Sequence, residues 1–121
     1  MLVNLAMSVL IALLPPPPIA PTYWGHLIPE IWGETMVEEV LTIIECESRN
    51  NPNSVNNKES HGSSYGLLQI AGPWVDGWIV NGRKNTSASL SHQLGITTTN
   101  QLLQPYWNLR AGKYIYDLYG G

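Results

Sequence analysis

The stretch that decides the fold is TMVEEVLTIIECESR, residues 35–49. Its apolar residues Val37, Val40, Leu41 and Ile44 follow the i, i+3, i+4 and i+7 spacing of one helix face, and Ile43 is expected on the same face. Thr35 with Glu38 three residues later has the pattern of a capping box, and the Asn51-Pro52 pair follows where the periodic run stops. The sequence therefore predicts an amphipathic helix over residues 35–49.

Glu47 is the acidic residue of this helix that we expect on its apolar side, in the last turn. Apolar neighbours and the negative end of the helix dipole both favour a protonated carboxyl. A protonated carboxyl is what a general acid requires. The alternative is that the stem of Glu47 packs on Ile43 and Ile44 while its head lies in solvent, and periodicity alone favours this alternative.

Composition sets limits on the class of protein. The chain has 121 residues, a formal net charge of −3, 44% hydrophobic residues and 12% charged residues, which is typical of one globular domain and too apolar for a disordered tail. The small negative charge argues against nucleic-acid binding by phosphate neutralisation. The single cysteine, Cys46, excludes an internal disulfide and a multi-cysteine zinc site, and we expect no metal and no cofactor.

The N-terminal 22 residues differ from the rest of the chain. Residues 1–14, MLVNLAMSVLIALL, form an apolar run that is shorter than the roughly 20 residues needed to cross a bilayer. The run is either a signal sequence for export or an apolar helix that contacts the domain, a membrane or a partner. Residues 15–22, PPPPIAPT, are typical of a stiff extended linker. We therefore expect the domain over residues 23–121.

Three short motifs follow one another along the chain. The first is Glu47-Ser48, which leads into the stretch Asn51-Pro52-Asn53-Ser54-Val55. The second is Gly66-Leu67-Leu68-Gln69-Ile70, and the third is Asn108 with Ala111-Gly112-Lys113-Tyr114. This order over residues 35–121 resembles the soluble lytic transglycosylase and goose-type lysozyme group of the lysozyme-like superfamily. In that group a helix ends in a catalytic Glu-Ser, a G-L-M-Q-I turn follows, and a later helix carries N-x-x-x-G-x-x-Y.

The resemblance implies a fold and an activity. The fold is a mainly α, lysozyme-like small single domain with a short loop or β region between the catalytic helix and the GLLQI segment. The activity is cleavage of the glycosidic bond between N-acetylmuramic acid and N-acetylglucosamine, so the expected partners are peptidoglycan glycan strands. Such an enzyme acts outside the cytoplasm, as an exported, periplasmic or cell-wall protein, or on a phage virion.

The resemblance also implies roles for single residues. Glu47 is the catalytic acid, and Ser48, Gly66, Gln69 and Tyr114 contribute to substrate binding. Each of the four has a plainer alternative. Ser48 is then a polar residue at a helix end, and Gly66 and Gln69 form a simple turn. Tyr114 is then a core residue, since it shares a helical stripe with Ala111, Ile115 and Leu118.

Most glycosidases use two carboxylates, and the second one is not evident here. Glu59 and Asp76 are candidates in expected loops, whereas Asp117 lies on an expected helix surface. In lytic transglycosylases the acetamido group and the C6 hydroxyl of the substrate replace the second carboxylate and the water, so transglycosylation is favoured over hydrolysis. A third alternative is a non-catalytic wall-binding relative, because the chain ends at Gly121, before the aromatic-Asn-Ala-Gly helix of the family.

The remaining segments have several interpretations. Residues 73–94 are expected to be a long loop or a pair of short turns. Trp74 and Trp78 within it could stack on sugars, but four-residue spacing favours a core role. Cys46 is expected to be a half-buried thiol rather than a nucleophile paired with His61 or His92. Pro105 either lies in the first turn of a final helix or divides two helices.

Overall fold

In the computed structural model, residues 23–120 are described, apart from the side chains of Lys58 and Glu59. The expected N-terminal segment, residues 1–22, lies outside the described residues. The α-helices are α2 (Leu27–Trp32), α3 (Val37–Ser48), α4 (Leu90–Leu94) and α5 (Pro105–Leu118). Three short 3-10 helices are η1 (Glu34–Met36), η2 (Gly72–Trp74) and η3 (Thr99–Leu103).

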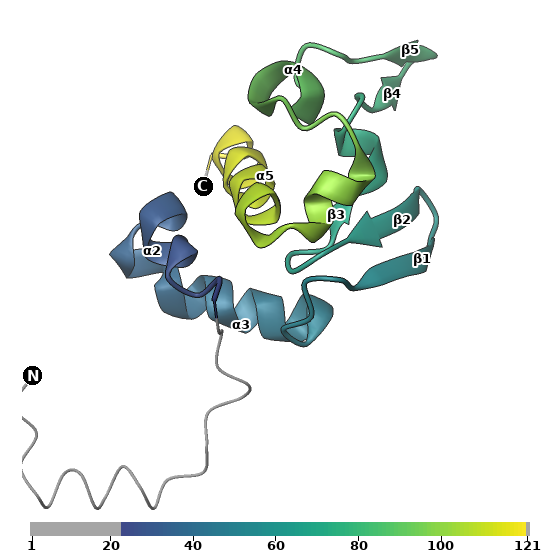
Figure 1. The fold of residues 1–121 in the computed structure, drawn as a ribbon. Coiled ribbons are helices and arrows are strands. Elements are labelled where there is room, and N and C mark those ends of the chain that lie inside the picture. The colour runs from purple at the N-terminus through teal and green to yellow at the C-terminus, as the bar shows by residue number, and fades with distance from the viewer. Residues whose placement is uncertain (1–22, 121) are drawn as a thin grey trace, which may run out of the picture.

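The strands are short and antiparallel. One sheet has the order β1-β2-β3, formed by β1 (Val55–Glu59), β2 (Gly62–Tyr65) and β3 (Ile70–Ala71), and the other is a hairpin of β4 (Ile79–Val80) and β5 (Arg83–Lys84). Figure 1 shows α5 in the middle of the molecule, with α2 and α3 on one side and α4 with the β4–β5 hairpin on the other. The protein is a small single domain, about half helical, and its β1–β2 hairpin lies between α3 and residues 66–70, as expected.

Helix α3 largely matches the predicted helix, but its start differs. Thr35 lies inside η1, and the residue before α3 is Met36, which makes no side-chain capping bond. The predicted capping box is therefore wrong, because the chain enters α3 through a 3-10 turn rather than from an extended residue. At the other end, Arg49 and Asn50 take left-handed φ values of 54° and 63°, so the helix stops before the Asn51-Pro52 pair.

The buried face of α3 is narrower than the apolar pattern predicted. Its buried residues are Val40, Ile44 and Ser48, which are spaced four apart. Ile43 is 36% exposed, so its expected place on the buried face is wrong. The row of buried residues packs with residues of α2 and α5 into a first core cluster, made of Trp24, Ile28, Trp32, Val40, Ile44, Leu67 and Leu109. The packing partners of α3, rather than its own apolar content, set which face is covered.

Helix α5 joins this cluster to a second one. Pro105 lies in its first turn, which confirms one of the two expected positions, because a proline there loses no helical hydrogen bond. Leu109 belongs to the first cluster and Ala111 to the second. The second core cluster consists of Ile70, Val75, Leu90, Ile96, Leu102 and Ala111. Because α5 contributes to both clusters, it fixes the position of the segments that pack on its two sides relative to each other.

The segment expected to be loop or turns, residues 73–94, has more regular structure than the sequence predicted. It contains the end of η2, the β4–β5 hairpin and α4. Asn81 and Gly82 both have positive φ, 53° and 75°, as the tight turn of a two-residue hairpin requires. Ser89 caps α4 by accepting a bond from the His92 backbone nitrogen at 3.2 Å. Within residues 23–120 no helix is long and apolar enough to cross a membrane.

Candidate functional site

Glu47 lies in the last turn of α3 with its side chain exposed. The expectation that it is the acidic residue on the core side of the helix is wrong, because the buried row runs through Ile44 and Ser48 instead. Glu45 is the more buried of the two, and its carboxylate accepts a bond from the side-chain nitrogen of Asn50. The Glu47 carboxyl is therefore open to a ligand from solvent, and the apolar surroundings predicted for it are not found.

Ser48 is buried at the end of the same helix. Its hydroxyl donates to the Ile44 carbonyl oxygen at 3.1 Å, one turn back. Its own carbonyl accepts from the Asn51 backbone nitrogen at 3.1 Å. These bonds fit a residue that shapes the helix end, which is the alternative to direct contact with a substrate.

The end of α3 is tied to the turn at residues 66–69 through Ser54. The side-chain oxygen of Asn51 accepts from the Asn53 backbone nitrogen at 3.0 Å, and the Asn51 carbonyl accepts from the Ser54 nitrogen at 3.2 Å. The Ser54 carbonyl then accepts two bonds, from the Gly66 nitrogen at 2.7 Å and from Gln69 Nε2 at 3.1 Å. The segments that carry Glu47 and Gln69 are thereby held against one another.

Gln69 closes its own turn. Its Nε2 also donates to the Gly66 carbonyl at 3.0 Å, and its backbone nitrogen donates to the same oxygen at 3.1 Å. Gln69 has a left-handed φ of 52°, which costs a non-glycine residue energy and is maintained by these bonds. The amide nitrogen is thus used inside the protein, and the amide oxygen is the part of this side chain that remains for a sugar.

Gly66 has a packing role that the sequence did not indicate. Its φ is +76°, and a Cβ at this position would lie closer than 3.0 Å to the Leu102 carbonyl oxygen and to the side-chain nitrogen of Asn108. From the sequence we expect a sugar to lie close to this glycine. The space next to its Cα is instead filled by the protein itself, by Leu102 of η3 and Asn108 of α5.

Asn108 holds this region together. It is completely buried on α5. Its Oδ1 accepts from the Leu68 nitrogen at 2.8 Å, and its Nδ2 donates to the carbonyls of Tyr65 at 2.8 Å and Leu102 at 2.7 Å. Sequence reasoning counted Asn108 as part of a motif and gave it no role. The available signal was an asparagine directly before Leu109 on a helix face that is otherwise apolar.

Tyr114 lies on another face of α5. Its hydroxyl donates to the Ala88 carbonyl at 2.9 Å, and its half-buried ring packs on the second core cluster. In the N-x-x-x-G-x-x-Y pattern the tyrosine stands three residues after the glycine, where this chain has Ile115. These contacts favour the alternative in which Tyr114 is a core residue.

The candidates for a second carboxylate belong to different segments of the fold. Asp76 is exposed and lines a cavity of about 390 Å³ together with His61 and Lys84. Asp117 forms an exposed ion pair with Lys113, with 2.7 Å between Nζ and Oδ1. Glu59 ends β1.

Cys46 is exposed, so the expectation of a half-buried thiol is wrong. It stands on the open side of α3, away from the row of Val40, Ile44 and Ser48 that packs on the core. Among residues 23–120, no group of three or more histidine, cysteine, aspartate or glutamate side chains is placed to hold a metal ion.

Comparisons of the chain with protein-family models, with curated proteins and with solved structures found no match.

Proposed function

We propose that the protein is a peptidoglycan-cleaving enzyme with a lysozyme-like fold, acting on the bond between N-acetylmuramic acid and N-acetylglucosamine as a lytic transglycosylase. Its place of action is the extracytoplasmic space or a phage virion. Glu47 is the single acid and base. The proposal rests on the order of the three motifs along the chain and on how the folded chain connects them.

One observation carries the proposal. Residues from all three motifs belong to one hydrogen-bonded unit, in which Ser54 joins the end of α3 to the 66–69 turn and Asn108 joins that turn to α5. The end of α3, which carries Glu47, is thus connected by hydrogen bonds to the 66–69 turn and through that turn to α5. The backbone that carries Glu47 is therefore held in place by these bonds, which supports a positioned general acid at this helix end.

The exposure of Glu47 suits a polymeric substrate, because a glycan strand has to lie across the surface rather than enter a closed cavity. Glu47 gives its proton to the glycosidic oxygen, the bond between that oxygen and C1 breaks, and the N-acetylglucosamine residue leaves with a free hydroxyl while the acetamido oxygen of the muramic acid residue bonds to C1. The C6 hydroxyl then bonds to C1, displaces the acetamido oxygen and returns its proton to Glu47. The product is a 1,6-anhydro sugar, and no second carboxylate is required.

The test is wall cleavage by matched variants. Glu47→Gln keeps the shape of the side chain and removes the transferable proton, so it should reduce the loss of turbidity of purified peptidoglycan at least about 100-fold. Glu45→Gln, two residues away on the same helix, is the control and should retain most of the activity. Cleavage by Glu47→Gln at the wild-type rate would refute the assignment of Glu47.

A further inference from the structure

One cavity of the domain is lined by residues that include neither Glu47 nor any residue of α3 or of the 66–69 turn. It has a volume of about 610 Å³ and is formed by η2, the β4–β5 hairpin, the segment before α4 and the end of α5. Its lining residues are Trp74, Gly77, Trp78, Val80, Asn85, Ala88, Ser89, Ile115, Leu118 and Tyr119. No charged side chain is among them, so a ligand that fits here is uncharged where it is enclosed.

Aromatic rings form one wall of this cavity. The Trp74 ring meets Trp78 edge to face at 6.1 Å and Tyr119 at 6.5 Å between ring centroids. Trp78 continues the row to His61 at 5.7 Å. Tyr119 is 79% exposed and both tryptophans are half-buried, so each ring keeps accessible surface. Perpendicular rings of this kind offer flat apolar faces to a ligand that is itself flat and partly apolar.

A polar group stands at the edge of the same cavity. The Asn85 backbone nitrogen donates to the Trp78 carbonyl at 2.7 Å, which fixes this residue against the aromatic wall. Its Oδ1 accepts from the Ser87 hydroxyl at 3.0 Å, and among the described residues its Nδ2 has no partner. The hydroxyl of Ser89, in contrast, is engaged with Thr86 and Ser91. Asn85 is therefore one group of the lining that can donate to a carbonyl or hydroxyl oxygen of a ligand.

We propose that this cavity is a binding site for an uncharged N-acetylated hexose unit. A pyranose ring presents a face of C–H groups that stacks on aromatic rings, and its hydroxyl groups remain at the open rim. The acetamido group supplies a methyl for the apolar lining and a carbonyl for Asn85. Choosing an acetamido sugar among neutral ligands rests on the proposed function, and the site would hold part of a glycan strand apart from the bond that is cleaved.

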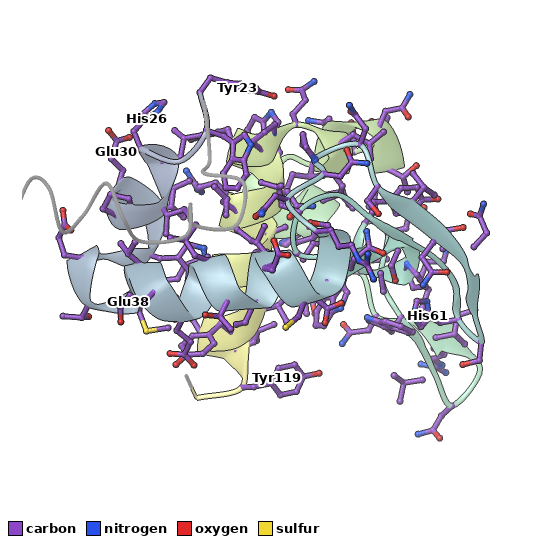
Figure 2. The ribbon with its side chains drawn as sticks, turned by 90° about the horizontal axis from the view of Figure 1, so that it is seen from below. Tyr23, His26, Glu30, Glu38, His61 and Tyr119 are labelled. Carbon is purple, nitrogen blue, oxygen red and sulfur yellow. The ribbon has the colours of Figure 1, made fainter. Side chains whose placement is uncertain are left out.

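Binding of triacetylchitotriose tests this site without any cleavage. The titration uses the Glu47→Gln protein and isothermal titration calorimetry. Adding Tyr119→Ala should weaken binding about 3- to 10-fold, since one stacking ring is lost. Adding Tyr23→Ala is the matched control, because Tyr23 is also exposed, at 66%, and Figure 2 shows it at the opposite edge of the molecule from Tyr119. That control should leave the affinity unchanged.

Three results would overturn the proposal: no binding of triacetylchitotriose, an unchanged affinity in the Tyr119→Ala protein, or equal binding of maltotriose, which has no acetamido groups. Its failure is distinguishable from failure of the proposed function. Sugar binding that depends on Tyr119 in a protein that never cleaves walls would refute the enzyme and support the site. Wall cleavage that depends on Glu47, together with sugar binding that does not depend on Tyr119, would support the enzyme and refute the site.

Discussion

Gly66→Ala should be among the most destabilising single substitutions in this domain, and Gly82→Ala is its matched control. Both glycines have nearly the same φ, +76° and +75°, so a Cβ adds the same backbone strain at each, about 1–2 kcal/mol. At Gly82 nothing lies within 4 Å of the added Cβ. At Gly66 the Cβ would come closer than 3.0 Å to Leu102 O and Asn108 Nδ2, which are already bonded to each other at 2.7 Å.

The difference between the two variants isolates the steric cost. Either η3 or Asn108 has to move, which breaks their bond and leaves a donor and an acceptor without a partner. Each such group costs about 1–3 kcal/mol, so with the backbone strain the total for Gly66→Ala is about 3–8 kcal/mol. Urea unfolding followed by circular dichroism measures both variants against wild type. A domain of this size is stable by only about 5–15 kcal/mol, so Gly66→Ala should unfold at much lower urea. Equal losses of stability in the two variants would refute the packing argument.

Three further substitutions, one control substitution and one product analysis extend these tests. Asn108→Ala should lose about 3–5 kcal/mol of unfolding free energy, because three backbone groups in buried or part-buried positions are left unpaired. Asn100→Ala, exposed on η3, should lose little, and urea titrations compare the two variants. Tyr114→Phe should lose about 1 kcal/mol and keep its wall-cleaving activity, and a large loss of activity would restore Tyr114 to the site. Lys113→Ala should cost less than about 1 kcal/mol, and less still in high salt, since its ion pair with Asp117 is partly exposed; thermal melts at two salt concentrations measure this. Mass spectrometry of released muropeptides should show anhydro ends one water lighter than hydrolysis products, and reducing ends alone would indicate a hydrolase.

Local patterns in the sequence predicted the parts of the fold that are determined locally. The apolar period predicted α3 to within two residues at its start, and Pro105 marked the first turn of α5. The period could not place Ile43 correctly, because the covered face depends on what packs against the helix. Helix α2 was missed because six residues with Pro29 near the start show too few turns for a periodic signal.

The order of the motifs in the sequence indicated the candidate site, but it did not indicate the hydrogen bonds within that site. Gly66, Gln69 and Asn108 were each visible in the sequence, but the bonds that explain them join residues 15 to 43 positions apart. Such pairings follow from tertiary packing and leave no periodic trace. The exposure of Glu47 was missed for the same reason, since it depends on where α3 meets its neighbours rather than on the helix alone.

The three bonds of Asn108 also bear on the order in which the domain folds. Two of them span 40 and 43 residues, and closing a loop of that length costs roughly 3 kcal/mol of chain entropy before any contact forms. Helix α3 has only short-range requirements and can form early, whereas the 66–69 turn needs α5. On a ribosome, the turn that carries Gln69 would reach its final geometry only after residue 108 had been synthesised and had left the exit tunnel. We therefore expect the hydrogen bonds of Asn108 to form late in folding and to complete the 66–69 turn.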